Sequence, residues 1–135
     1  MGVYAELESE FDFEIVEEFL SHFIIMIEPM EKLVIGLKNE ASFSDNINQL
    51  FRTFHNIKSA TGYLKIKPIN TLVTLVEEVL EECRLVEGEG SEALVSWLIL
   101  VCDQLSDYRD DLENDVEKFC VLNHRIIKVP VKFTV

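Results

Sequence analysis

Residues 47–64 read INQLFRTFHNIKSATGYL, and this stretch has the spacing of an amphipathic helix. Residues suited to a buried face recur at three- and four-residue steps, which is the period of one side of an α-helix: Ile47, Leu50, Phe54, Ile57, Thr61 and Leu64. The segment just before it, Ala41-Ser-Phe-Ser-Asp45, supplies candidate N-cap residues. The sequence therefore predicts a long helix here with one buried stripe.

Three further segments show the same apolar period. One runs from Phe13 to about Leu37, and we expect Pro29 to bend it. Another starts near Pro68, which suits a first helical turn; its apolar stripe reaches Cys83, and Gly88 and Gly90 end the run. The last is capped by Ser91 and runs to about Cys120. Short connections between four such helices predict an all-α, antiparallel four-helix bundle over residues 1–120.

The last fifteen residues follow a different period. Apolar residues alternate with Pro130, Lys132 and Thr134 between 129 and 135, which predicts an extended tail or an edge strand over residues 121–135. Three roles are open for this tail. It packs on the bundle, pairs with a partner, or leads towards a further domain.

Composition and charge restrict the class of protein. With 48% hydrophobic and 27% charged residues, the chain is typical of one soluble domain. A net charge of -13 would repel a phosphate backbone, so we expect no nucleic-acid partner. The apolar stretch 23–27 is far shorter than the roughly 20 residues that cross a bilayer, and no signal peptide is apparent. We expect a cytoplasmic monomer without membrane contact.

The three cysteines are odd in number and widely spaced, without a CxxC pair or a Cys/His cluster. We interpret Cys83, Cys102 and Cys120 as reduced core residues and predict no metal site. A carboxylate-bridged metal bundle would need Glu-x-x-His pairs on two helices, and the sequence has none.

His55 is the residue on which a functional interpretation depends. At about 100° per residue, it points away from the buried stripe of its helix and faces solvent. Three residues with an aromatic or small side chain lie within about 40° of His55 around the helix axis: Phe51, Ser59 and Gly62. Two cations flank it at about 60° on opposite sides: Arg52 and Lys58.

These neighbours suit phosphoryl transfer. A neutral imidazole is a competent nucleophile near neutral pH, because the unperturbed pKa of histidine is roughly 6.5. Lys58 can stabilise the charge of a transferring phosphoryl group. Ser59 and Gly62 leave the helix surface low, which lets a partner approach the imidazole. A glycine within a helix costs about 1 kcal/mol relative to alanine, so Gly62 needs a compensating reason.

The run from Phe51 to Leu64 resembles the signature of histidine phosphotransfer (HPt) domains, including the N-terminal phosphoacceptor domain of chemotaxis histidine kinases. In that family the histidine is followed at the third, fourth and seventh places by lysine, glycine and glycine. His55, Lys58 and Gly62 match this pattern, whereas Ser59 replaces the first glycine. Lys65 stands where many members have another glycine.

The resemblance implies a phosphocarrier of a two-component phosphorelay, with no cofactor. His55 would carry the phosphoryl group with support from Lys58, and a receiver domain or a histidine kinase would be the partner. The receiver-binding residues would be Phe51, Arg52, Ser59, Gly62 and Lys65. No glycine-rich nucleotide loop or kinase motif is present, so we do not expect the chain to phosphorylate itself from ATP. It is a free phosphocarrier or the phosphoacceptor part of a larger histidine kinase.

An alternative stays open. In it the bundle is an HPt-like binding module that docks on a receiver or kinase, inhibits it and is never phosphorylated. A lone exposed histidine is most often an ordinary solvated residue, and Phe51 fits the rim of the core as well as a docking surface. We interpret the acidic runs 77–78, 81–82 and 110–111 as solvated helix faces.

Charge is unevenly distributed along the chain. Between Asn46 and Val76 there is no Asp or Glu. The same window holds four cations, Arg52, Lys58, Lys65 and Lys67. The receiver partner implied by the resemblance carries acidic residues around its phosphorylated aspartate. We therefore predict a locally positive docking patch on an otherwise acidic bundle.

Overall fold

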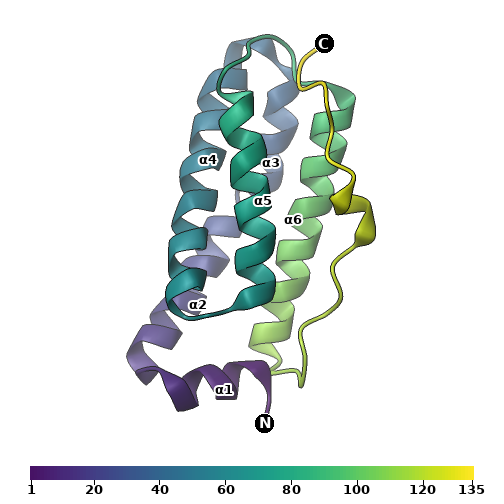
Figure 1. The fold of residues 1–135 in the computed structure, drawn as a ribbon. Coiled ribbons are helices and arrows are strands. Elements are labelled where there is room, and N and C mark those ends of the chain that lie inside the picture. The colour runs from purple at the N-terminus through teal and green to yellow at the C-terminus, as the bar shows by residue number, and fades with distance from the viewer.

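The computed structural model describes all of residues 1–135, and its regular structure is entirely helical. The elements in chain order are α1 (Val3–Glu10), α2 (Phe13–Ile27), α3 (Met30–Ile35), the 3-10 helix η1 (Gly36–Lys38), α4 (Glu40–Tyr63), α5 (Lys67–Cys83), α6 (Glu92–Glu113) and the 3-10 helix η2 (His124–Ile127). Figure 1 shows α4 and α5 side by side at the front of the view, with α6 on the far side of α5 from α4 and with α2 and α3 behind. The all-α fold class is confirmed. None of these helices combines the length and the apolar character needed to span a membrane.

The predicted stripe of α4 forms part of a single core. Its side chains are almost completely removed from solvent, namely Ile47, Leu50, Phe54, Ile57, Thr61 and Leu64. Full burial of one large apolar side chain stabilises a fold by about 1.5–3 kcal/mol. The stripe therefore sets the rotation of α4 about its axis and leaves His55 on the outer face.

The two ends of α4 are defined by local hydrogen bonds. The helix begins earlier than the Ala41–Asp45 segment suggests, because the Asn39 side chain accepts a hydrogen bond from the Ala41 amide at 2.9 Å. At the other end, the Ile66 amide donates to the Thr61 carbonyl at 2.9 Å and the Lys65 amide donates to the Gly62 carbonyl at 3.3 Å. These two bonds form a Schellman motif, with Lys65 at φ 57° in the left-handed region.

The prediction of one bent helix from Phe13 to Leu37 was wrong. The segment is two α-helices separated at Glu28 and Pro29, followed by η1. Proline has no N–H for the bond to the carbonyl four residues earlier, so α2 ends here and α3 begins after it.

The last long helix is also shorter than predicted, since α6 ends at Glu113 rather than near Cys120. Two residues on, Asp115 adopts φ 47°, and its carboxylate accepts hydrogen bonds from the Tyr4 and Ala5 amides at 2.9 and 3.0 Å. It thereby caps α1, a helix that the sequence did not predict. A Cβ on Gly2 would overlap Asp115, so glycine permits this close approach. Helix α1 lies across the end of the bundle (Figure 1).

The C-terminal tail packs on the bundle, one of the three roles left open by the sequence. Ile126 is fully buried, and its carbonyl accepts a hydrogen bond from Trp97 Nε1 at 2.8 Å. Further along, Ser91 Oγ donates to the Lys132 carbonyl at 2.6 Å. The alternating residues form no strand, only one isolated antiparallel bridge between Gly90 and Thr134. The tail is therefore not an edge strand, and it is not extended throughout, because η2 occupies His124–Ile127.

Candidate functional site

His55 lies on the exposed face of α4, as predicted, but it is not isolated. Its side chain is 57% exposed, and its Nδ1 atom lies 3.2 Å from Glu77 Oε2 on α5. A carboxylate can only accept a hydrogen bond, so this contact favours a proton on Nδ1. The lone pair of a neutral imidazole then lies on Nε2.

Glu77 also contacts Lys58 through its second oxygen. Lys58 Nζ donates to Glu77 Oε1 at 3.4 Å, and the glutamate side chain is only 15% exposed. The interpretation of residues 77–78 as a solvated face was therefore wrong for Glu77, although Glu78 is exposed. For comparison, a fully exposed ion pair contributes about 0–1 kcal/mol to stability, and this pair is partly buried on the Glu77 side. Its importance here is that one carboxylate holds both the histidine and the lysine.

Phe51 lies one turn before His55 and packs against its ring. The two ring centroids are 6.3 Å apart and the ring planes differ by 17°. Phe51 is half-buried and contacts the core, so it does lie at the core rim. The guanidinium carbon of Arg84, the residue after α5, is 4.5 Å from the Phe51 centroid.

The other predicted residues lie where the helical projection placed them, or at the end of the helix. Arg52, Ser59 and Gly62 are exposed on α4. A Cβ on Gly62 would meet only Asn70 Nδ2, at 3.5 Å, which is an ordinary contact. Alanine would therefore fit at position 62 within the folded chain. Lys65 is exposed in the turn after α4, in a backbone conformation that favours glycine.

Sequence reasoning missed three residues of this site, all from α5 or its end. Asn70 Nδ2 donates to the Lys58 carbonyl at 2.9 Å and to Thr61 Oγ1 at 3.2 Å, which ties α5 to α4. Glu77 and Arg84 are the other two. These three polar residues are seven positions apart, so about 20° of rotation separates neighbours on the helix surface. That heptad spacing is the signal that could have found them.

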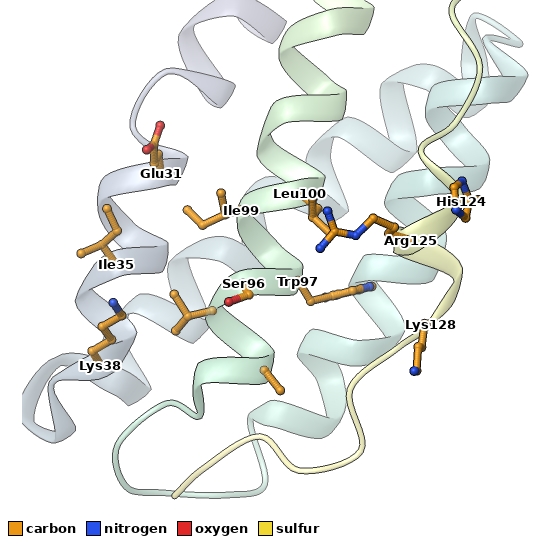
Figure 2. A pocket seen from close by; sticks show the side chains of 12 residues that line it. Glu31, Ile35, Lys38, Ser96, Trp97, Ile99, Leu100, His124, Arg125 and Lys128 are labelled. Carbon is orange, nitrogen blue, oxygen red and sulfur yellow. The ribbon is translucent and has the colours of Figure 1, made fainter.

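The largest cavity of the molecule lies elsewhere. It has a volume of about 880 Å³ and lies between α3, α6 and the segment around η2, and no residue of α4 or α5 lines it. Figure 2 shows Lys38, Arg125 and Lys128 around it, with Ile35, Trp97 and Leu100 as apolar lining. The predicted residues are therefore not part of this cavity.

The cysteines offer no competing nucleophile. All three are free; Cys83 and Cys102 are buried, and Cys120 is partly buried. Burial raises the pKa of each thiol to about 12, so the thiols are protonated at neutral pH.

Comparison with known proteins identifies the family. Residues 14–118 match the family model of the Hpt domain. The chain belongs to the Hpt domain family. The resemblance predicted from the stretch around His55 is thereby confirmed, and the Hpt domain has a role in histidine phosphotransfer in two-component signalling.

One curated relative of this Hpt domain is the sensor histidine kinase CheAY of Helicobacter pylori (strain ATCC 700392 / 26695). The two are 25% identical over 118 residues, which cover 78% of this chain and 14% of the relative. The chain thus corresponds in length to a small part of that kinase. No solved structure matches the chain.

Proposed function

We propose that this Hpt domain carries a phosphoryl group on Nε2 of His55 and exchanges it with an aspartate of a receiver domain or with a histidine kinase. One observation carries the proposal most directly. The exposed imidazole is held at Nδ1 by Glu77, and Lys58 shares the same carboxylate. This arrangement supports a nucleophile that is oriented, accessible and next to a cation.

The chemistry follows from the tautomer. With the proton on Nδ1, the Nε2 lone pair attacks the phosphorus of a phosphoaspartate, an N–P bond forms, and the bond to the aspartate oxygen breaks. The imidazole ring becomes positively charged as it bonds to phosphorus. Glu77 lies 3.2 Å from Nδ1, so its carboxylate stabilises that charge and holds the ring direction. The reverse transfer uses the same contacts.

Lys58 supports the phosphoryl group rather than the ring. Phosphoryl transfer depends mainly on alignment and on cations that neutralise the equatorial oxygens. The lysine is 40% exposed and one turn from His55, so its ammonium group can leave Glu77 and reach those oxygens. The phosphoryl donor is another domain, and this domain acts as a monomeric phosphocarrier without ATP chemistry of its own.

The surface around His55 supports a docking role for the remaining predicted residues. Gly62 costs about 1 kcal/mol in a helix, yet alanine would fit at that position. The reason for glycine therefore lies outside the folded chain, and close approach of a receiver to His55 supplies one. Ser59 keeps the neighbouring surface low, while Phe51, Arg52 and Lys65 contact the receiver around it.

A binding module that is never phosphorylated is the second candidate. It requires the same exposed surface but not the pairing of His55 with Glu77. That pairing orients a nucleophilic nitrogen towards solvent, which an inhibitor that acts only by docking does not need. The phosphocarrier is therefore the better supported function.

The test is to transfer phosphate from a phosphorylated receiver and locate it. We expect an acid-labile, alkali-stable phosphoramidate on His55, complete loss of labelling in His55→Gln, and full labelling in His22→Gln. His22 is the matched control, because it is an exposed histidine on α2. Undiminished labelling of His55→Gln with intact helicity would refute the assignment and leave the docking module.

A further inference from the structure

Arg84, the exposed residue at the end of α5, makes three side-chain contacts. Its Nε donates to Asn48 Oδ1 at 3.1 Å, and its Nη1 lies 3.8 Å from Glu81 Oε2. Its guanidinium carbon is 4.5 Å from the centre of the Phe51 ring, within the range of a cation–π interaction. A long side chain normally keeps much of its rotamer freedom at the surface. Here three contacts restrict it.

Phe51 connects this arginine to the imidazole. Its side chain is half-buried and packs on the core, and its ring centroid lies 6.3 Å from that of His55, with the two ring planes nearly parallel at 17°. The contacts therefore run without a gap from Arg84 through Phe51 to His55. In this series Phe51 contacts the imidazole ring from the same helix, α4, whereas the carboxylate of Glu77 contacts it from α5.

Two contacts are needed to fix the direction of Nε2. A single hydrogen bond from Nδ1 to Glu77 fixes the position of one ring atom but lets the ring tilt about that contact. The flat side chain of Phe51 restricts this tilt, because an imidazole packed near it loses part of its freedom of rotation. The hydrogen bond and the ring contact together determine where the Nε2 lone pair points.

We infer that Phe51 and Arg84 are positioning residues that hold the His55 imidazole in line for phosphoryl transfer, with Arg84 acting through Phe51. This inference rests on the proposed function of His55. Neither side chain contacts the phosphoryl group in this role. Reactions of this kind are sensitive to alignment, and a misplacement of about 1 Å can reduce a rate by about 100-fold.

The kinetic experiment separates positioning from docking. In transfer from a phosphorylated receiver, Phe51→Leu should lower the maximal rate by about tenfold, since it keeps an apolar side chain but loses the flat ring. Arg84→Gln should lower that rate by about threefold, and Arg84→Lys should recover part of it. For Arg84→Gln the receiver concentration at half-maximal rate should not change, whereas Phe51→Leu should raise it in addition to lowering the maximal rate, because Phe51 also contacts the receiver in the proposed function. Arg109→Gln, which removes a partly buried arginine with ion pairs on α6, is the matched control and should change neither quantity.

A second measurement does not depend on transfer. In the unphosphorylated protein, nitrogen NMR of the His55 ring should report a proton mainly on Nδ1, with a broader or mixed tautomer signal in Phe51→Leu. If wild type transfers no phosphate, the proposed function fails, whereas these ring signals still decide the positioning role. Unchanged ring signals and an unchanged maximal rate in both variants would show that the residues are only structural. A higher half-maximal receiver concentration with an unchanged maximal rate would make them docking residues, which also overturns the inference.

Discussion

One carboxylate serves two neighbours at the centre of this site. Glu77 contacts His55 with one oxygen and Lys58 with the other, at 3.2 and 3.4 Å. When a phosphoryl group is present on Nε2, its oxygens compete with Glu77 for the ammonium group of Lys58, while Nδ1 can keep its contact. Lys58 is therefore expected to act in the transfer step and to contribute little to folding.

This expectation can be tested with Lys58→Ala. We expect the transfer rate to fall by about tenfold, which corresponds to about 1.4 kcal/mol of transition-state stabilisation. The free energy of unfolding should change by less than about 0.5 kcal/mol, as is usual for an exposed side chain. Rapid-quench transfer assays and urea unfolding measure the two quantities, with Lys67→Ala as the control for removal of an exposed cation. A large fall in melting temperature with unchanged transfer kinetics would show that Lys58 is structural.

The end of α4 is the clearest case in which one element carries local strain. Lys65 occupies the left-handed position of a Schellman motif at φ 57°, a conformation that costs a residue with a Cβ about 1–2 kcal/mol. Lys65→Gly should therefore raise the free energy of unfolding by about 0.5–1 kcal/mol, after allowance for the greater freedom of glycine in the unfolded chain. Equilibrium urea unfolding would measure the gain.

The control for this change is Lys65→Ala, which removes the same charge but keeps the Cβ. It should show no gain in stability. Equal effects of glycine and alanine would mean that the lysine charge, not the backbone conformation, determines the difference.

Helix boundaries show where local sequence patterns stop being informative. The buried stripe of α4 was predicted correctly because the spacing of apolar residues along one helix indicates which of its faces is buried. The end of α6 was not predicted correctly. The apolar spacing continues past it, because a non-helical segment also packs on the core through Val116, Phe119 and Cys120. Periodicity reports burial and not backbone hydrogen bonding. Helix α1 is short, and its cap comes from Asp115, far along the chain.

The candidate site also contains residues that the sequence predicted and residues that it did not. His55, Lys58 and Gly62 lie on one helix, so their spacing predicted a shared face. Glu77 is 22 residues from His55 and belongs to another helix. Its place opposite the imidazole depends on the register of α5 against α4, which no pattern within either helix specifies. The seven-residue spacing of the polar residues on α5 indicates that they share one face, but it does not identify which residues of α4 that face contacts.

At the scale of the molecule, the fold changes the charge pattern seen in the sequence. The window from 46 to 76 contains no acids, but the fold brings Glu77 beside Lys58. Lys65 and Lys67 line a groove together with Glu6, Glu10 and Glu117. Arg52 has no ion pair, so we expect the positive patch to be smaller than the sequence predicts and to centre on Arg52.

We expect Arg52→Glu combined with Lys65→Glu to slow receiver association at low salt, with Arg52→Glu alone producing most of the effect. The difference from wild type should largely disappear near 1 M salt, where the screening length is about 3 Å instead of about 10 Å at 0.1 M. Stopped-flow association rates over a salt series measure this.

The matched control is Lys38→Glu with Lys128→Glu. It makes the same change in net charge at the cavity between α3, α6 and η2. Equal slowing by both double variants would show that net charge, rather than a local patch, governs docking. Equal association rates for wild type and the Arg52/Lys65 double variant at low salt would refute the hypothesis that this patch speeds receiver association. The proposed chemistry of His55 would not be affected.

The cap that Asp115 places on α1 has a consequence for how the molecule opens. The first amides of α1 are protected from hydrogen exchange only while the segment after α6 is in place, so the two segments form one cooperative unit of local unfolding. The Val3 amide, which donates to the Val116 carbonyl at 2.7 Å, belongs to the same unit. His55 lies outside it, between Phe51 and Glu77 on α4 and α5. Fraying at the base of the bundle can therefore proceed and reverse without disturbing the orientation of the imidazole.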